Sequence, residues 1–263
     1  MKKTRLDILL TERGLAESRT KAQALIMAGR VRVDGQTQLK PGAPVAAEST
    51  LTVEAGPRFV SRGGEKLDAA LAAFSIDARG LVCADVGAST GGFTDCLLQR
   101  GAAKVYALDV GKGILHWKIR TDPRVAVMEG TNARFVESLP EGVDLVTIDA
   151  SFISLKTLLP VVRAWFREDR RRVGAVALIK PQFEAGKKDA ARGEGVIRDP
   201  AVHKQVLTNV LAFAQSEGWS VRGLIRSPLL GPKGNMEFLA WLGWGEPGMV
   251  EGLIEAVVRG GGG

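Results

Sequence analysis

Short apolar runs alternate with segments of helical periodicity along most of this chain. The apolar runs lie at 81–85, 104–110, 125–128, 143–148 and 173–179. Between them, apolar residues recur three or four positions apart, as in 111–120 and 155–166, which predicts helices packed on a sheet. Two further runs, 219–225 and 237–242, predict a hairpin at one edge of that sheet. The alternation predicts an α/β fold with a doubly wound, mainly parallel sheet.

The first part of the chain follows a different pattern. A leucine-rich periodic segment predicts a short helix that ends at Gly14, and Ser18 is a candidate N-cap for a second helix. The alternating segments 31–33 and 51–53 predict short strands, so this part forms a small α+β module. The predicted organisation is this module at 1–56, a linker at 57–63, the α/β domain at 64–246 and a C-terminal tail at 247–263.

The composition is ordinary for a soluble globular protein. The 263 residues are 45% hydrophobic and 25% charged. No apolar run is long enough to cross a bilayer, and charged residues interrupt the apolar part of the N-terminus, so we expect a cytoplasmic protein without a membrane partner. Cys83 and Cys96 fall on a predicted strand and on the helix after it, so we expect reduced core cysteines and no metal.

Positive charge is concentrated near the start of the chain. The formal net charge is +7, and residues 1–60 contain ten Lys/Arg against six Asp/Glu. This excess favours a polyanionic partner such as nucleic acid. Because the chain has only one tyrosine, we expect binding to depend mainly on phosphate contacts and on the shape of the nucleic acid.

A glycine-dense loop connects the first strand of the α/β domain to its helix. Gly87, Gly91 and Gly92 allow positive φ angles and leave room for a ligand near the backbone N–H groups of the helix N-terminus. Ser89 replaces the second glycine of a G-x-G-x-x-G fingerprint, and no Gly-Lys-Ser/Thr follows, so neither a dinucleotide nor a phosphate-binding loop is indicated. The alternative is a packing turn.

The acid that ends the second strand narrows the choice of ligand. Asp109 lies about twenty residues after the loop, where an acid can accept both hydroxyls of a ribose. S-adenosylmethionine fits, because its carboxylate suits the helix end, its ammonium suits Asp85 and its ribose suits Asp109. Asn132 follows the third strand and either reaches the adenine or caps the next helix. The candidate cofactor-binding residues are Asp85, Gly87, Ala88, Ser89, Thr90, Gly91, Gly92, Phe93, Asp109, Val110 and Asn132.

Charged residues also mark the ends of other predicted elements. Asp149 follows the fourth strand and Lys180 the fifth, at the carboxyl edge where open α/β sheets bind ligands. Lys66 lies in the first turn of a predicted helix, where a cation opposes the helix dipole, so it is either functional or a surface lysine. The basic run 167–172 predicts a solvated loop or an addition to the nucleic-acid footprint, and 187–198 predicts a mobile lid.

The N-terminal module resembles a known family of RNA-binding domains. The sequence RLDILLTERGLAESRTKAQALIMAGRVRVDG is similar to an S4 domain. Such domains bind structured RNA with the second helix and the turn after it. The resemblance therefore implies an RNA contact through Arg5, Arg19, Lys21, Arg30 and Arg32. The alternative is a solvated basic helix face.

Five motifs of the α/β domain resemble the FtsJ-type ribose 2′-O-methyltransferases, within the TlyA (hemolysin A) family. They are SRGGEKL, DVGASTGGFTDCLL, IDASFISL, LIKPQFEAGK and GNMEF. The resemblance implies a Rossmann-like methyltransferase sheet and a catalytic tetrad of Lys66, Asp149, Lys180 and Glu237. It further implies S-adenosylmethionine as cofactor, and as substrate the 2′-hydroxyl of cytidine in small- or large-subunit ribosomal RNA, free or within ribosomal subunits.

The tetrad suits the chemistry, because a ribose hydroxyl is a poor nucleophile until its proton is removed. We expect Lys180 to be the base, Asp149 to orient it, and Glu237 and Lys66 to hold the ribose. RNA base methylation is an alternative, although no Cys nucleophile or Asn-Pro-Pro-aromatic motif is present. A non-catalytic ribosome-assembly factor is another, although all four tetrad residue types are intact. A membrane-active toxin is disfavoured because the sequence has no spanning segment. A pseudouridine synthase is disfavoured because it would have no use for the adenosyl-binding loop.

Overall fold

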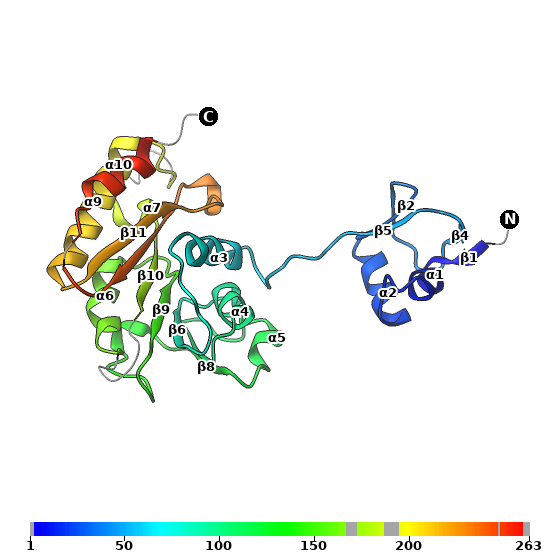
Figure 1. Cartoon of the computed structure of the whole chain (residues 1–263), viewed down its shortest axis with the longest axis horizontal. Coiled ribbons are helices and arrows are strands. Elements are labelled where there is room, and N and C mark those ends of the chain that lie inside the picture. The colour runs from blue at the N-terminus through cyan, green and yellow to red at the C-terminus, as the bar shows by residue number, and fades with distance from the viewer. Residues whose placement is uncertain (1–2, 167–172, 187–194, 247, 260–263) are drawn as a thin grey trace. The chain divides into compact units, whose positions relative to one another are not determined.

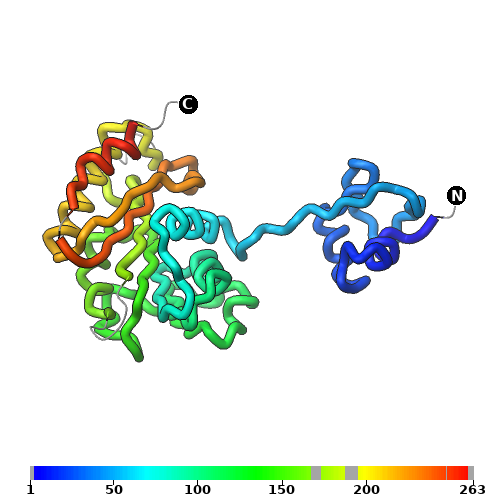
Figure 2. The backbone as a smooth tube through the Cα atoms, viewed as in Figure 1, coloured from blue at the N-terminus to red at the C-terminus, as the bar shows by residue number. Residues whose placement is uncertain are grey.

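The computed structural model describes residues 3–166, 173–186, 195–246 and 248–259. The chain forms two compact units, Met1–Arg58 and Phe59–Gly263. Figure 1 shows the helices and strands of each unit, and Figure 2 shows the course of the backbone. The basic run at 167–172 and the part of the predicted lid at 187–194 lie outside the described residues.

The N-terminal unit packs two helices, α1 (Leu6–Glu12) and α2 (Arg19–Met27), beside two small antiparallel sheets. Ser18 caps α2, since its Oγ accepts a hydrogen bond from the backbone N–H of Lys21 at 3.2 Å. Strand β2 pairs with β3 and β5, and β1 pairs with β4. The strands are β1 (Lys3–Arg5), β2 (Val31–Val33), β3 (Gln36–Gln38), β4 (Pro44–Ala46) and β5 (Leu51–Val53). The predicted α+β class of this module is confirmed.

The second unit contains a seven-stranded sheet in the order β11-β12-β10-β9-β6-β7-β8. The strands from β10 to β8 are parallel, and β12 runs antiparallel to both β10 and β11. Their bounds are β6 (Val82–Val86), β7 (Lys104–Asp109), β8 (Val125–Glu129), β9 (Leu145–Ile148), β10 (Gly174–Ile179), β11 (Ser220–Arg226) and β12 (Phe238–Gly243). The predicted doubly wound sheet is therefore confirmed, with its antiparallel pair at one edge.

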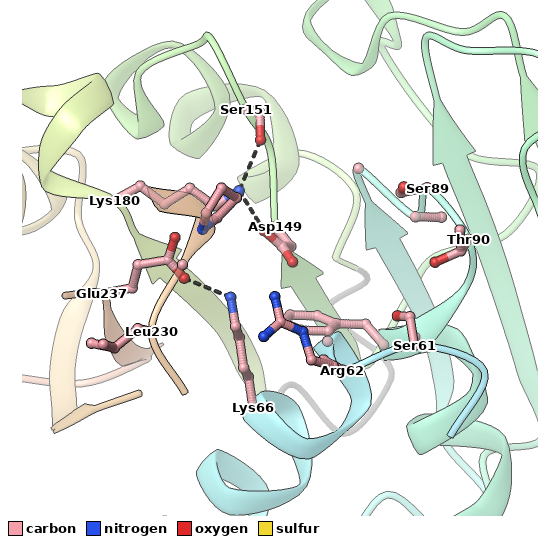
Figure 3. Close-up of a pocket in the computed structure, with 17 residues that line it drawn as sticks. Ser61, Arg62, Lys66, Ser89, Thr90, Asp149, Ser151, Lys180, Leu230 and Glu237 are labelled. Atoms are coloured by element: carbon pink, nitrogen blue, oxygen red, sulfur yellow. Dashed lines mark hydrogen bonds and ion pairs between the residues drawn. The ribbon is translucent and has the colours of Figure 1, made fainter. Parts of the chain in front are cut away.

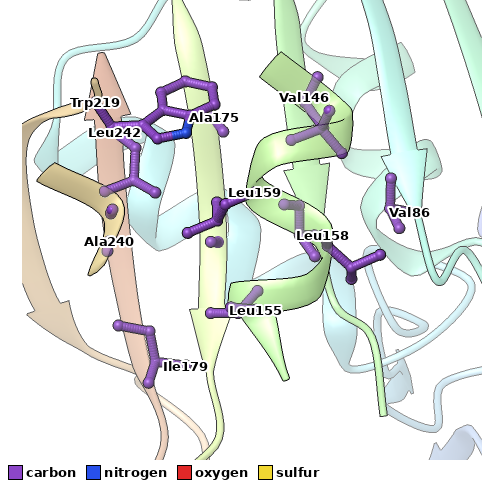
Figure 4. Packing of buried hydrophobic residues seen from close by; sticks show 14 of the residues in the cluster. Val86, Val146, Leu155, Leu158, Leu159, Ala175, Ile179, Trp219, Ala240 and Leu242 are labelled. Atoms are coloured by element: carbon purple, nitrogen blue, oxygen red, sulfur yellow. The ribbon is translucent and has the colours of Figure 1, made fainter. Parts of the chain in front are cut away.

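Helices cover both faces of this sheet. Alternate residues of β6 point to opposite cores: Cys83 packs in the core of α3 and α4, and Ala84 packs in the core of α6 and α9. Figure 4 shows Leu155 and Leu159 of α6 against the strands of the second core. The helices are α3 (Gly63–Ala73), α4 (Gly92–Gln99), α5 (Trp117–Arg120), α6 (Leu155–Arg163), α7 (Pro181–Glu184), α9 (Pro200–Ser216) and α10 (Glu251–Arg259), with short 3-10 turns at η1 (Ala133–Phe135) and η2 (Pro232–Gly234).

The helix predicted at 111–120 is wrong over its first half, because only Trp117–Arg120 is helical. Glu129, at the end of β8, accepts hydrogen bonds from the backbone N–H groups of Gly113, Ile114 and Leu115. Gly113 also has φ +72°, which a right-handed helix does not allow, so the segment is a loop that these bonds hold in place. The Arg120 guanidinium and the N–H groups of Gly113 and Leu115 lower the pKa of Glu129 to about 2.

The end of the chain contains a helix where the sequence pattern suggested no structure. Helix α10 packs against α9 and β11 and buries Ile254. Arg226 of β11 donates hydrogen bonds to the carbonyl oxygens of Val257 and Val258 near the end of α10. Within the described residues, no helix combines the length and the apolar character that a membrane span requires.

Candidate active site

Two adjoining cavities lie at the carboxyl edge of the parallel strands. The first has a volume of about 360 Å³ and the second about 440 Å³. Both are lined by Gly87 and Ser89 of the glycine-rich loop and by Asp149 and Ser151, which follow β9. This is the edge at which open α/β sheets bind ligands, so the cavities are the candidate site.

All four residues of the expected tetrad line the first cavity, where they form two ion pairs (Figure 3). Lys180 Nζ lies 2.6 Å from Asp149 Oδ1 and donates to Ser151 Oγ at 2.9 Å. Lys66 Nζ lies 2.6 Å from Glu237 Oε2, and both side chains are buried. The structure therefore brings together four side chains from α3 and from the ends of β9, β10 and the loop before β12.

Glu237 has one carboxylate oxygen that is not satisfied by the protein. Its Oε2 accepts from Lys66, but its Oε1 is buried and has no hydrogen-bond partner among the described residues. A Cβ on Gly231 would lie 2.1 Å from this Oε1, so the glycine allows the loop before β12 to cover the carboxylate closely. A buried oxygen left unpaired is costly, and its place in the cavity indicates a ligand that donates a hydrogen bond.

Two glycines of the loop lie so close to neighbouring segments that a side chain would not fit. Gly87 has φ +84°, and a Cβ there would lie 2.7 Å from the carbonyl oxygen of Asp149. A Cβ on Gly92, at the start of α4, would lie 2.1 Å from Ser61 Oγ. The glycines thus let the loop pack directly against the segment after β9 and against the segment before α3.

Most of the expected cofactor residues surround the cavities. Ala88, Thr90, Gly92 and Phe93 line the first cavity. Gly91 lines neither cavity; it is the N-cap of α4, with φ +94°. The second cavity is lined by Asp109, Val110 and Asn132.

Asp85 lies near the end of β6, as the sequence pattern predicted, but its side chain does not face a cavity. It is fully buried, lines neither cavity, and accepts hydrogen bonds from Thr94 Oγ1 at 2.7 Å and Thr147 Oγ1 at 3.1 Å. Burial raises the pKa of Asp85 to about 7, although the two hydroxyls favour the charged form. The expected direct contact with a cofactor ammonium is therefore corrected: this carboxyl lies beneath the loop and connects β6 to α4 and β9.

The side chains of Asp109 and Asn132 accept hydrogen bonds from backbone N–H groups. Asp109 accepts from the N–H groups of Ser89 at 2.8 Å and Gly111 at 2.7 Å, so it holds the glycine-rich loop as well as lining the cavity. Asn132 accepts from Arg134 N–H at 3.2 Å and caps η1. Asn132 therefore caps a turn, which is one of the two alternatives, and it also lines the second cavity, where its contact with an adenine stays a prediction.

Several residues at the cavities were not singled out from the sequence. Ser61 and Arg62 precede α3 and line the first cavity, and Figure 3 shows the Arg62 guanidinium directed into it. Phe152 lines the second cavity, is 90% exposed and has φ +62°, which is unusual for a bulky residue. Its ring centroid lies 4.9 Å from that of Phe183. Ser61 and Arg62 fall within the SRGG motif and Phe152 within IDASF, so the motifs were a usable signal.

The expected RNA-binding cations of the N-terminal unit lie on its surface in ion pairs and hydrogen bonds. Buried Asp7 pairs with Arg5 Nη2 at 2.9 Å and with Arg19 Nε at 3.0 Å, and these arginines, Arg5 above all, hold the pKa of Asp7 far below its ordinary value. The other pairs are Lys21 with Glu17, Arg32 with the Glu54 carboxylate, and Arg30 with the Glu54 carbonyl oxygen. The arginines are therefore fixed in direction rather than free.

Comparisons with known proteins agree with the division of the chain into two units. The model of the FtsJ-like methyltransferase family matches residues 59–244, and that of the S4 domain matches residues 4–51. The chain is 47% identical to YqxC of Bacillus subtilis, a proposed rRNA methyltransferase, over 92% of this chain and 86% of that protein.

Two further relatives match most of the chain. It is 47% identical to the 16S/23S rRNA (cytidine-2′-O)-methyltransferase TlyA of Mycobacterium tuberculosis over 92% of this chain and 90% of that protein. A solved structure from Streptococcus thermophilus, a proposed hemolysin, is 42% identical with a TM-score of 0.73, covering 98% of this chain and 95% of the other. The chain therefore belongs to the FtsJ-like methyltransferases, within the TlyA family that carries an S4 domain before the methyltransferase domain.

Proposed function

We propose that this chain methylates the ribose 2′-hydroxyl of cytidine in ribosomal RNA, with S-adenosylmethionine as methyl donor. The observation that carries the proposal is the ion pair of Lys180 with Asp149, in a cavity that adjoins the glycine-rich loop. The name of the M. tuberculosis relative supports the same reaction. Because ribosomal RNA is the substrate, we expect the enzyme to act in the cytoplasm.

S-adenosylmethionine fits the chemistry of the two cavities. Asp109 and Asn132 would hold the ribose and the adenine in the second cavity. Thr90 and Gly92 line the first cavity beside the N-terminus of α4, where a carboxylate is favoured. When bound, the cofactor supplies an electrophilic methyl group on a positively charged sulfur.

Lys180 is the candidate base for the ribose hydroxyl. Asp149 and Ser151 contact its Nζ and so fix the direction of the amine. A lysine in an ion pair with Asp149 carries a proton, and this proton must pass to solvent water before the neutral amine can accept the hydroxyl proton. The same contacts keep the nitrogen in place through both protonation states, which favours a reactive geometry.

Glu237 and Lys66 would hold the substrate ribose. The unpaired Oε1 of Glu237 can accept a hydrogen bond from a hydroxyl, and Lys66 fixes the other oxygen. DNA lacks the 2′-hydroxyl that the reaction requires, so the substrate is RNA. The role of this pair is therefore substrate positioning rather than proton removal.

Exposed groups at the cavities suit a nucleotide. Arg62 is exposed at the first cavity and can contact a phosphate, with Ser61 beside it. Phe152 presents an exposed ring at the second cavity, and RNA-binding proteins stack unpaired bases on such rings. We infer that the target cytidine is turned out of its stack before it reaches Lys180.

We assign substrate capture to the S4 module at 1–56. Its cations Arg5, Arg19, Lys21, Arg30 and Arg32 would contact phosphates of folded ribosomal RNA. In this organisation, residues 57–63 are the linker and residues 64–246 carry the chemistry. The tail at 247–263 has no role in the reaction that we can assign.

Nucleoside mass spectrometry tests the proposal. Purified protein is incubated with unmodified ribosomal subunits and labelled S-adenosylmethionine, and the RNA is digested to nucleosides. We expect 2′-O-methylcytidine to carry the label. Label on a cytosine base would overturn the assignment of the ribose, and no label on either subunit would overturn the assignment of ribosomal RNA as substrate.

A further inference from the structure

Two loops that carry the candidate catalytic lysine and its acidic partner contact each other at several consecutive points. Strands β9 and β10 are parallel neighbours, and Ile148 is the register partner of Ala177. The chain continues from β9 to Asp149 and from β10 to Lys180. Beyond the last β9–β10 ladder pair, the contacts between these two segments are made by side chains.

We propose that Glu184 is a positioning residue, which holds the segment after β9 against the segment after β10 and so keeps Lys180 in place. Its Oε2 accepts from Ser154 Oγ at 2.6 Å, and its Oε1 accepts from the backbone N–H of Leu155 at 2.7 Å. Both oxygens of the carboxylate are thus used on the other loop. The proposal rests on the proposed function for its catalytic consequence, but its geometry does not.

The contacts form an ordered series along the two loops. Lys180 pairs with Asp149 and Ser151, the Phe183 ring meets the Phe152 ring, and Glu184 bonds the start of α6. Each step along one loop therefore meets a later residue of the other loop. Glu184 closes this series at the end furthest from the strands, where it bonds directly to the start of α6.

Backbone strain inside the series supports this role. Phe152 adopts φ +62°, a conformation that a bulky residue keeps only when its surroundings fix it. Phe152 lies between Asp149 and Ser154, so it is held on one side by Lys180 and on the other by Glu184. Release at Glu184 would let this backbone relax and would move Asp149 and Ser151 relative to Lys180 Nζ.

A simple helix-capping role for Glu184 makes a different prediction. Its carboxylate lies at the N-terminus of α6, where negative charge is favoured, so its loss lowers stability in either case. Asp144 offers a matched control, since it is buried and accepts from Val82 N–H at 2.8 Å, at the other end of β9 and away from both cavities. Asp144→Ala should therefore reduce stability without moving Lys180.

The experiment compares full-length Glu184→Ala, Glu184→Gln and Asp144→Ala proteins. Each is labelled with ¹³Cε,¹⁵Nζ-lysine, and the Lys180 side-chain signal is identified by its absence in Lys180→Ala protein. We expect Glu184→Ala to shift the Lys180 signal and to slow single-turnover methyl transfer by about 10- to 100-fold, with cofactor Kd changed by less than about threefold. Glutamine can accept from Leu155 N–H and donate to Ser154 Oγ, so Glu184→Gln should stay within about threefold of the wild-type rate.

The lysine signal decides between the two roles. An unmoved Lys180 signal in Glu184→Ala protein would overturn the proposal, even if the transfer rate fell. An equal shift in Asp144→Ala protein would overturn it too, because the effect would then follow from general destabilisation. If the wild-type protein showed no methyl transfer at all, the proposed function would fail, while the lysine signal would still test the position of Lys180.

Discussion

Lys66 Nζ and Glu237 Oε2 lie 2.6 Å apart although 171 residues separate them in the chain. The pair joins α3, near the start of the methyltransferase domain, to the loop before β12, near its end. Both side chains are buried, so each charge depends on the other for compensation. The pair therefore holds two distant parts of the chain together at the first cavity. It leaves one oxygen of Glu237 for a ligand.

Separating stability from activity tests this pair. Lys66→Met leaves the Glu237 carboxylate buried and unpaired, and we expect the free energy of unfolding to fall by about 3–5 kcal/mol. The double variant Lys66→Met/Glu237→Leu should recover most of that loss, because an apolar pair replaces two buried charges, yet it should not transfer methyl groups. Urea unfolding and a transfer assay measure the two quantities. A double variant that still transferred methyl groups would show that the pair is structural only.

Asp85 makes stability depend on pH. Burial raises its pKa to about 7, while the unfolded carboxyl titrates near about 4. The folded state therefore binds the extra proton, and the stability that this group contributes is lost as the pH rises from about 4 through about 7. Asp85→Asn removes the titration. From about pH 4 to about pH 8, its unfolding free energy relative to wild type should increase, by up to about 4 kcal/mol. A difference that stayed constant with pH would contradict a buried, proton-binding Asp85.

Asp7 should be important for the stability of the N-terminal unit. Asp7→Ala removes the acceptor of Arg5, Arg19 and Gln23, so we expect the protection of this unit against hydrogen exchange to fall by at least about 2 kcal/mol. RNA affinity should fall with it, since the two arginines lose their fixed direction. Because the folded pKa of Asp7 is depressed, its contribution in the wild type is present above about pH 4 and is lost as the pH falls.

The exposed Glu17 is the control for Asp7, since its one ion pair within the described part of the chain is with Lys21 at the surface of the same unit. Glu17→Ala should leave the protection of this unit nearly unchanged, because solvent screens an exposed ion pair. Equal effects of the two variants would show that Asp7 has no special role.

Asp109 should control cofactor affinity. Asp109→Ala removes the proposed ribose acceptor and also the acceptor of Ser89 and Gly111 N–H, so calorimetry should show S-adenosylmethionine binding weakened by about 10- to 100-fold. Asp122→Ala is the control, because Asp122 pairs with Arg124 away from both cavities. Unchanged affinity in Asp109→Ala protein would place the cofactor elsewhere.

The elements that position the site could be predicted from the sequence, because buried parallel strands are continuous apolar runs and their carboxyl ends share one edge. Asp149 and Lys180 were therefore both placed at this edge from strand ends, and the family resemblance grouped them into one site. The helix at 111–120 was wrong because Gly113 has φ +72° and Glu129, at the end of β8, holds the segment around it as a loop. Such long-range competition is not visible in local periodicity.

The error at Asp85 has a similar origin. An acid at the end of a strand has the same local sequence pattern whether it faces a ligand or neighbouring hydroxyls. Here the hydroxyls of Thr94 and Thr147 donate hydrogen bonds to it. The pairing of Lys66 with Glu237 was equally hidden, since it depends on how α3 meets the loop before β12. From the sequence, only the similarity to the family's motifs placed these two residues in one site.

Single-turnover methyl transfer by the Lys180 variants tests most directly whether this side chain removes the ribose proton. With cofactor and ribosomal substrate bound, we expect Lys180→Ala to be about 10² to 10⁴ times slower than wild type, with both affinities nearly unchanged. Lys180→Arg should be no faster than Lys180→Ala, because a guanidinium keeps its proton and cannot accept another. Near-normal transfer by Lys180→Arg would contradict the account, because a positive charge paired with Asp149 would then suffice.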